Sequence, residues 1–194
     1  MARFEDITGR EVLLKASGLK SGRILDVGMG SCACMSLFLA TLGFEVTGVD
    51  RSPHVIHVAR QKGARKRLKG SFMARRADAT SLPFGKGVFD AVISFHSLHH
   101  MDNPVPAIRE MFRVCRPGGM VLVADLNETG RKVYKHKADP GSRLLRSIER
   151  VSKSKSTGVR IVDTRMDRLF ICQNKDSGSM EAVEKLKTTE VNKK

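Results

Sequence analysis

The chain has 194 residues, enough for one domain with a substantial hydrophobic core. Apolar residues make up 41% of it, but no apolar run approaches the roughly 20 residues of a membrane-spanning helix, which excludes that class of protein. The 35 Lys and Arg against 20 Asp and Glu leave a net charge of +15, which favours anionic partners, nucleic acid among them.

The first residues and the cysteines indicate an intracellular setting. MARFEDITGR carries acidic residues and lacks the apolar stretch of a secretory signal. The four cysteines, Cys32, Cys34, Cys115 and Cys172, are too few and too scattered for a disulfide framework, so we expect reduced thiols. We therefore predict a cytoplasmic protein.

Strand-like apolar runs alternate with helical segments along most of the chain. Residues 3–16 predict a helix within an N-terminal extension of residues 1–20. Five strands are then expected, in RILDVGM, EVTGVD, GSFMARRAD, VFDAVISF and GGMVLVADL. Helices are expected in SCACMSLFLATLG, SPHVIHVARQKGA and NPVPAIREMFRVCRPGG. Continuous apolar strands separated by helices are typical of a parallel sheet covered on both faces.

Small polar residues and glycine mark the expected ends of two helices. Ser31 is positioned to cap the helix after the first strand, and Gly43 to end it. Ser52 is positioned to cap the next helix, with Pro53 in its first turn. The buried stripe of that second helix is predicted to contain Val55, Ile56 and Ala59.

The last two strands, GVRIVD and RLFICQN, are separated by only a few residues around TRMD. That connection is too short for a crossover helix and predicts an antiparallel hairpin. The predicted fold is therefore α/β, Rossmann-like and doubly wound, a mostly parallel seven-stranded sheet with an antiparallel C-terminal hairpin. Residues 1–176 would form a single domain, and the polar residues 177–194 a mobile tail.

Two glycines lie where the first strand should end. Gly28 and Gly30 precede a helix, where backbone N–H groups and the helix terminus can approach a ligand. GMGSCA fits the dinucleotide pattern G-x-G-x-x-G/A, and Asp50 ends the next strand at the position expected of a ribose-binding acid. By themselves these residues are compatible with a nicotinamide-dependent oxidoreductase.

Further motifs, in order along the chain, favour another cofactor. Asp26 before the glycines, then RADATSLPF, then FDAVISFHSLHHMDNPVPAIREMFRVCRPGGMVLVAD resemble class I S-adenosylmethionine (SAM)-dependent methyltransferases. The resemblance covers about residues 22 to 126, and its last segment is similar to the ubiquinone- and menaquinone-biosynthesis branch. It implies SAM as the cofactor, with Asp26 near its amino acid end, Asp50 on the ribose and Asp78 at the adenine. The candidate cofactor-binding residues are Asp26, Gly28, Gly30, Asp50, Arg51, Asp78, Ala79 and Ser94.

Three of these residues also have plainer interpretations. Asp50 could be an exposed strand-end carboxylate without a ligand, and Asp78 could cap the turn that follows it. Arg51 could stack on the cofactor or simply be solvated.

Cys32 departs from the family pattern, which usually has a third glycine there. Its side chain could crowd the methionine end of the cofactor or line it. No Cys and His spacing completes a zinc site with Cys32 and Cys34, so we expect no metal. A reactive thiol is also compatible with this position, because a helix N-terminus stabilises a thiolate, although simple packing is favoured.

Three histidines follow the fourth strand, at the edge where open α/β sheets hold ligands. Methyl transfer from a sulfonium requires mainly alignment, and a histidine is suited to remove a proton from the acceptor. We expect at least one of His96, His99 and His100 to face the acceptor; in the alternative, two of them bind local backbone groups. The fourth strand ends in SFHS and lacks the Asn/Asp-Pro-Pro-aromatic motif of DNA-adenine and glutamine N-methyltransferases. The absence of that motif disfavours DNA adenine and glutamine as acceptors.

Two basic segments bear on the acceptor. Residues 59–77 contain eight Lys and Arg and no acid, on the expected adenosine side of the sheet. RKVYKHK, residues 131–137, follows the fifth strand and is closer to the expected acceptor. We predict a small, anionic metabolite as the acceptor, with RNA as the alternative. An NAD-dependent oxidoreductase and an inactive RNA-binding scaffold are less favoured, and a merely solvated basic surface is the plain interpretation.

Overall fold

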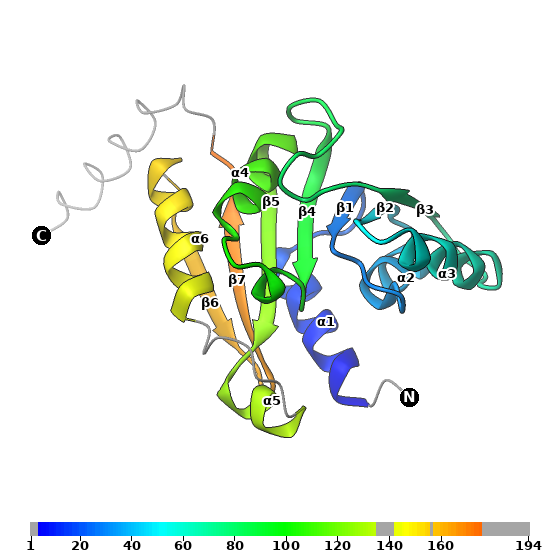
Figure 1. Cartoon of the computed structure of the whole chain (residues 1–194), viewed down its shortest axis with the longest axis horizontal. Coiled ribbons are helices and arrows are strands. Elements are labelled where there is room, and N and C mark those ends of the chain that lie inside the picture. The colour runs from blue at the N-terminus through cyan, green and yellow to red at the C-terminus, as the bar shows by residue number, and fades with distance from the viewer. Residues whose placement is uncertain (1–3, 135–141, 156, 176–194) are drawn as a thin grey trace, which may run out of the picture.

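The computed structural model describes residues 4–134, 142–155 and 157–175. A seven-stranded sheet runs through it in the order β3-β2-β1-β4-β5-β7-β6 (Figure 1). Its strands are β1 Arg23–Val27, β2 Glu45–Asp50, β3 Ser71–Arg76, β4 Phe89–Phe95, β5 Cys115–Leu126, β6 Val159–Asp163 and β7 Asp167–Gln173. Strands β1 to β5 pair in parallel, and β7 is antiparallel to both β5 and β6. The predicted Rossmann-like sheet and its C-terminal hairpin are confirmed; the predicted tail, residues 177–194, lies outside the described residues.

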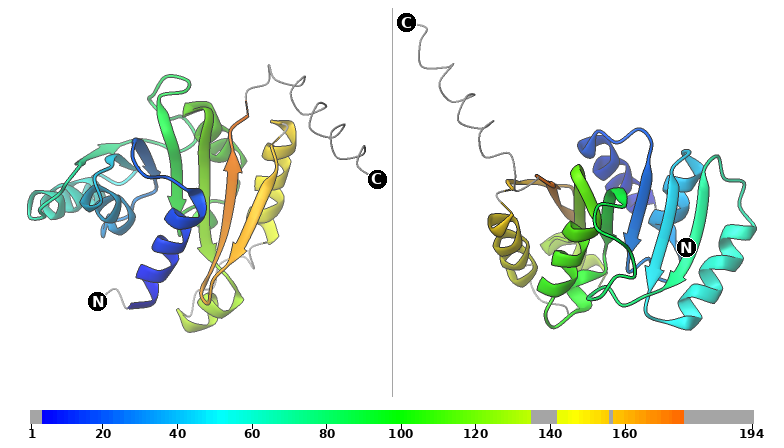
Figure 2. Two further views of the ribbon diagram at one scale, coloured as in Figure 1. Left: turned by 180° about the vertical axis from the view of Figure 1, so that it is seen from behind. Right: turned by 90° about the horizontal axis from the view of Figure 1, so that it is seen from above.

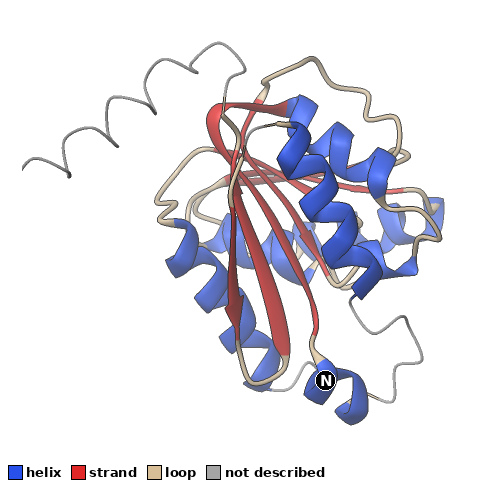
Figure 3. Cartoon of the chain, turned by 90° about the vertical axis from the view of Figure 1, so that its left-hand side faces the viewer, coloured by secondary structure: helices blue, strands red, loops and turns tan. Residues whose placement is uncertain are grey.

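Helices cover both faces of the sheet (Figure 3). Their bounds are α1 Phe4–Ser17, α2 Cys34–Thr41, α3 Pro53–Ala64, α4 Val105–Val114, α5 Glu128–Val133 and α6 Ser142–Ser154, with a 3-10 turn, η1, at Leu98–His100. Helices α1 and α2 share one apolar core with the sheet, and α4 and α6 share the core on the other face. In Figure 2 the β6–β7 hairpin forms one edge of the sheet, with α6 beside it. No helix in the described ranges is long and apolar enough to cross a membrane.

The helix after β1 begins later than predicted. The chain first turns through a hydrogen bond from the Ala33 N–H to the Gly30 carbonyl, and α2 starts at Cys34. Ala33, at φ 46°, is the N-cap residue, so the predicted cap at Ser31 is wrong: Ser31 lies within the preceding turn. Gly43, at φ 108°, follows the end of α2 as predicted.

The expected cap of α3 is present. The Ser52 hydroxyl accepts a hydrogen bond from the Val55 N–H, and Pro53 is in the first turn. Ile56 and Ala59 are buried against β3 and α2, and Val55 packs beside them. The predicted stripe is therefore confirmed, and it fixes α3 on the same face of the sheet as α2.

The connection between β3 and β4, residues 77–88, contains no helix. It is held by two side chains of α4. The Arg113 guanidinium donates to the carbonyls of Leu82 and Phe84 at 2.9 and 2.8 Å, and a Glu110 carboxylate oxygen accepts from the Leu82 N–H at 2.8 Å. An ion pair of 2.6 Å between Glu110 and Arg113 joins the two. These contacts fix the path of the chain between β3 and the start of β4.

Candidate active site

A cavity of about 600 Å³ opens at the carboxyl ends of β1, β2, β3 and β4. This edge includes the point between β1 and β4 where the chain reverses its direction of strand addition, the usual ligand position in open α/β sheets. Its volume is in the range of small-molecule and cofactor sites. The sequence-predicted site residues that line it are Gly28, Asp50, Arg51, Asp78, Ala79 and His100.

The two loop glycines differ in what constrains them. Gly28 has φ 74° and its N–H donates to the Val49 carbonyl; a Cβ at this position would overlap the Ser97 side chain. Gly30 has φ 63°, but a Cβ there would meet no atom within 4 Å. Gly28 is thus required by a close approach within the protein, while Gly30 leaves open space beside the loop. That space fits a ligand approaching the backbone closely.

Asp50 fixes the glycine loop from the end of β2. One carboxylate oxygen accepts from the Ser52 N–H at 2.9 Å, and the other accepts from the Gly30 N–H at 3.3 Å. The carboxylate also lines the cavity, as does exposed Arg51, whose carbonyl accepts from the Arg76 side chain at 3.1 Å. Asp50 is therefore tied into the loop and presents an acceptor group to the cavity, which fits a hydroxyl-bearing ligand such as a ribose.

Asp78 caps its own turn and also lines the cavity. Its Oδ1 accepts from the N–H and the hydroxyl of Thr80 at 2.8 and 2.7 Å. These two hydrogen bonds hold the pKa of the Asp78 carboxyl below its usual range, and the one from the Thr80 backbone N–H has the larger effect. The side chain stays ionised as an acceptor at neutral pH, and the plain turn-capping interpretation is compatible with a ligand contact.

Asp26 and Ser94 are placed away from the cavity lining. Asp26 is buried and accepts a hydrogen bond of 2.5 Å from the Ser36 hydroxyl on α2. Burial raises the pKa of Asp26 to about 6, against the opposing effect of that hydrogen bond. Ser94 is fully buried and donates to the Val27 carbonyl at 3.0 Å. Both side chains brace β1 beneath the glycine loop, and direct contact of either with a cofactor stays a prediction.

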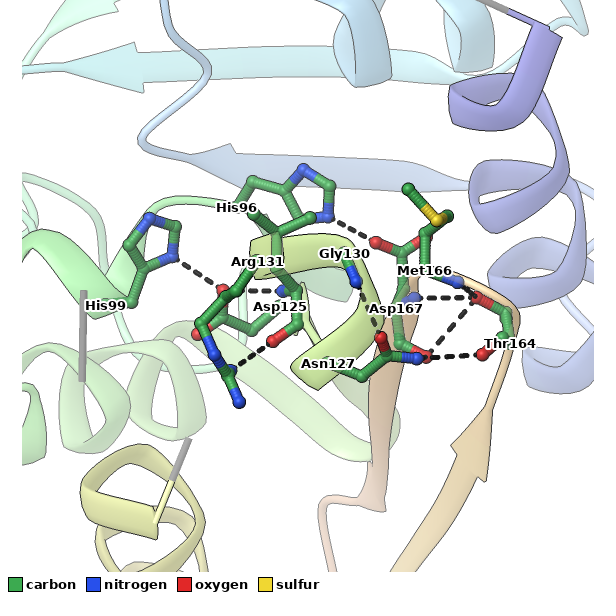
Figure 4. A network of polar contacts seen from close by, with 10 residues as sticks. His96, His99, Asp125, Asn127, Gly130, Arg131, Thr164, Met166 and Asp167 are labelled. Carbon is green, nitrogen blue, oxygen red and sulfur yellow. Dashed lines mark hydrogen bonds and ion pairs between the residues drawn. The ribbon is translucent and has the colours of Figure 1, made fainter. Parts of the chain in front are cut away.

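The three histidines have different partners, and Figure 4 shows His96 and His99 each facing a carboxylate. His100 lines the cavity. His96 Nε2 lies 2.6 Å from Asp167 Oδ1, and His99 Nδ1 lies 2.6 Å from Asp125 Oδ1. The sequence analysis offered the alternative that two of the histidines bind local backbone groups. In the structure, the rings of His96 and His99 instead contact carboxylates on β7 and β5.

The His96–Asp167 pair is held by its surroundings. His96 has φ 54°, a strained conformation for a residue with a side chain, and its N–H donates to the Ala124 carbonyl. Asp167 is buried, and Gly9 on α1 leaves the space for its carboxylate, because a Cβ at Gly9 would overlap Oδ2. The Thr164 hydroxyl accepts from the Asp167 N–H at 2.8 Å. Three separate elements therefore fix this carboxylate against the imidazole.

Cys32 and Cys34 lie at the start of α2, where the Cys34 N–H donates to the Cys32 sulfur at 3.3 Å. A hydrogen bond from the Cys34 side chain lowers the pKa of the Cys32 thiol to about 6, and the same contact raises the pKa of Cys34. The positive charge of Arg10 on α1 also acts on both. Nowhere in the described ranges do three His, Cys, Asp or Glu side chains gather into a metal site.

Three residues of this region escaped the sequence analysis. Arg10 is buried, its guanidinium lies 5.8 Å from the centre of the Phe38 ring, and its Nε has no hydrogen-bond partner among the described residues. Asp125 ends an apolar strand, a signal that could have identified it. Arg10 and Asp167 carry no such signal. The sequence does not show how α1 packs on the sheet, which positions Arg10, or where the turn of the β6–β7 hairpin places Asp167.

The fold and the cavity at its switch point define a protein of the class I methyltransferase type. A family model described as a methyltransferase domain matches residues 25–123. The chain belongs to this methyltransferase domain family, and membership implies SAM as the cofactor.

Relatives and a solved structure agree with this assignment. The chain is 35% identical over 117 residues to the O-methyltransferase cnsE of Penicillium expansum, covering 60% of this chain and 42% of that protein. It is 37% identical over 119 residues to the demethylmenaquinone methyltransferase of Beutenbergia cavernae, covering 61% and 47%. The chain thus spans less than half the length of these curated relatives. A solved Methanococcus maripaludis structure shares the fold, with a TM-score of 0.74 at 19% identity over 88% of this chain and 85% of the other.

Proposed function

We propose that this protein is a methyltransferase that moves a methyl group from SAM to a small, anionic metabolite. The proposal depends on one observation, the hydrogen bond between the Asp50 carboxylate and the Gly30 N–H of the glycine loop. This contact lies beside the open space at Gly30 and the cavity of about 600 Å³. When bound, SAM supplies a methyl group activated on sulfonium, which a nucleophile displaces directly. The names of the two relatives support methyl transfer as the reaction class.

The residues around the cavity suggest how the cofactor would be held. Asp50 would accept hydrogen bonds from the ribose hydroxyls, and Asp78 from the adenine amino group, since both carboxylates line the cavity. Gly28 and Gly30 would let the loop backbone approach the ligand. Arg51 at the rim would cover the adenosine. Asp26 and Ser94 would act indirectly, by bracing β1 and its loop.

Arg10 would hold the carboxylate of the methionine part of SAM. Its guanidinium is buried, and its Nε has no hydrogen-bond partner within the described ranges. Burying such a donor is costly unless an acceptor is supplied. Its charge acts on Cys32 and Cys34, which follow the glycine loop. An arginine and a carboxylate form a strong, charge-assisted pair, so an anion bound here would satisfy the free donor.

On the acceptor side, His100 is the histidine that lines the cavity and would take the proton from the acceptor. Next to the same sheet edge, a smaller cavity of about 180 Å³ is lined by Asp125, Asn127, Arg131 and Arg168, among others. Arg131 is held there by a hydrogen bond of 2.6 Å to the Leu126 carbonyl. A guanidinium fixed at this position supports an acceptor that carries a carboxylate or phosphate.

RNA is the second candidate acceptor, favoured by one observation. The eight Lys and Arg between residues 59 and 77 pair with no carboxylate in the described part of the chain. All eight are exposed, on α3, on the edge strand β3 and on the connection between them. Such a face gives phosphate affinity that falls steeply with salt.

The decisive experiment uses SAM carrying a tritiated methyl group, incubated with the protein and a cell extract, with and without prior RNase treatment. We expect small labelled product that survives RNase. Label lost from large material after RNase would replace the metabolite by RNA. The matched control is Asp50→Ala, which should lose transfer and SAM binding while keeping the circular dichroism of the folded protein. Tight NADH binding without SAM binding would contradict the proposal altogether.

A further inference from the structure

Two thiols of this protein are accessible and in contact, whereas the other two are enclosed. Cys32 is exposed and Cys34 is partly exposed, while Cys115 and Cys172 are buried. The Cys34 N–H donates to the Cys32 sulfur at 3.3 Å, so the Cys32 sulfur lies at the backbone of its neighbour. The intervening residue, Ala33, has a left-handed backbone conformation with φ 46° and ψ 34°, so the chain curls between them. The pair is thus a preformed dithiol.

The surroundings of Cys32 favour a thiolate. The thiol lies just before the first turn of α2, where the helix N-terminus carries partial positive charge. Lys62 on α3 and Arg10 on α1 add positive charge from two other elements. Negative charge is also present, because Cys32 and the buried carboxyl of Asp26 act on each other, and Asp50 acts on Asp26. Two cations and the start of α2 therefore place positive charge around an exposed sulfur.

We propose that Cys32 is a modification site for low-molecular-weight disulfides, and that Cys34 resolves the adduct into an intrachain Cys32–Cys34 disulfide. In the first step the Cys32 thiolate attacks one sulfur of the disulfide, whose S–S bond breaks and releases one thiolate, which takes up a proton. In the second step Cys34 loses its proton and attacks the Cys32 sulfur, releasing the other thiol. The two cysteines lose two electrons, and the small disulfide gains them and becomes two thiols.

The modification would occupy the glycine loop. Cys32 is two residues after Gly30, beside which the structure leaves open space. An adduct on Cys32 would fill that space, and a closed disulfide would change the turn that precedes α2. This consequence rests on the proposed function: we expect the oxidised protein to bind SAM at least ten-fold more weakly than the reduced protein.

The test treats the whole reduced protein with glutathione disulfide at pH 7 and follows intact mass and peptide maps. The wild type should pass through a one-glutathione adduct on Cys32 and end two hydrogens lighter with a Cys32–Cys34 bridge. The Cys34→Ser variant should stop at the adduct, and Cys34→Ala replaces it if Cys34→Ser misfolds. Cys32→Ser should form neither the adduct nor the bridge. Buried Cys115 and Cys172 are internal controls. Iodoacetamide alkylation of Cys32 in Cys34→Ala should mark this site as faster than the buried pair.

The outcomes separate the two proposals. Absence of the Cys32 adduct in the Cys34 variants would overturn the modification site, and an adduct that persists in the wild type would overturn the resolving role of Cys34. Titration of reduced and oxidised protein with S-adenosylhomocysteine then tests the consequence. If the thiols exchange as described but the reduced protein binds no cofactor, the proposed function fails and the modification site stands. Equal affinity in both redox states would contradict the coupling between them.

Discussion

His96 Nε2 lies 2.6 Å from Asp167 Oδ1, although the two residues are 71 positions apart in the sequence. A carboxylate only accepts hydrogen bonds, so Nε2 carries the hydrogen of this contact. The contact also stabilises the left-handed backbone of His96, at φ 54°, at the end of β4. The backbone at the end of β4 is thus held by Asp167, a residue from the C-terminal hairpin.

The space for this contact comes from Gly9, which gives a direct test. Gly9→Ala should destabilise the protein by about 1–3 kcal/mol, because the new methyl group overlaps the Asp167 carboxylate. In the Asp167→Ala background the same change should be neutral or stabilising by up to about 1 kcal/mol, since alanine is the better helix former. Urea unfolding of the four proteins measures the difference. Equal effects in both backgrounds would show that the two residues are not coupled.

The two loop glycines should respond differently to alanine. Gly28→Ala forces a clash with Ser97 and should lower both stability, by about 2 kcal/mol or more, and cofactor affinity. Gly30→Ala meets no atom within 4 Å, so it should cost only about 1 kcal/mol of backbone strain while still reducing SAM affinity at least ten-fold. Calorimetric titration with S-adenosylhomocysteine, paired with thermal unfolding, tests this. Unchanged affinity in Gly30→Ala would remove the loop from the cofactor site.

Asp26 should make stability fall as pH rises. Its pKa is 3.8 in a model peptide and about 6 in the folded protein, so between these values the folded state alone keeps the proton. The folded state therefore binds more protons than the unfolded state, and the unfolding free energy drops by roughly 3 kcal/mol from pH 4 to above pH 6. Other carboxyls act in the opposite direction, so the quantity to measure is the difference between wild type and Asp26→Asn. A difference that is independent of pH would contradict the raised pKa.

Arg10→Met should weaken cofactor binding selectively. The change keeps an apolar stem against Phe38 and removes the guanidinium, so S-adenosylhomocysteine should bind about ten-fold or more weakly. Methylthioadenosine, which lacks the amino acid portion, should bind equally well to variant and wild type. The ratio of the two affinities is the measurement. A matched loss for both ligands would indicate a general effect on the fold.

The sheet could be predicted from the sequence because its strands are continuous apolar runs with short connections. The hairpin followed from the few residues at TRMD, and the α3 cap from Ser52 and Pro53 next to one another in the chain. These signals are local. The false cap at Ser31 was also a local inference, which failed because a turn closed by the Gly30 carbonyl comes before the helix.

The polar partners of the site were not predictable in the same way. Nothing in the spacing of SFHSLHH indicates which histidine reaches the cavity, because Asp125 and Asp167 are brought to His99 and His96 by the order of β5 and β7 in the sheet. Arg10 reaches the start of α2 only through the packing of α1. Residues that line the cavity at the ends of β1, β2 and β3 could therefore be predicted from local motifs, whereas the positions of Arg10, His96 and His99 depend on tertiary contacts.

The order β5-β7-β6 has a consequence for how the chain is made. Because β7 pairs with β5 and is the last strand of the described chain, the outer edge of β5 stays unpaired during synthesis until residue 173 has emerged. Helix α1, which contacts β5 and β7, completes its packing only then, although it is synthesised first. An unpaired strand edge is a template for association with other chains. The nascent protein is thus most exposed to aggregation just before its final strand is released, and chaperone dependence should be concentrated in that interval.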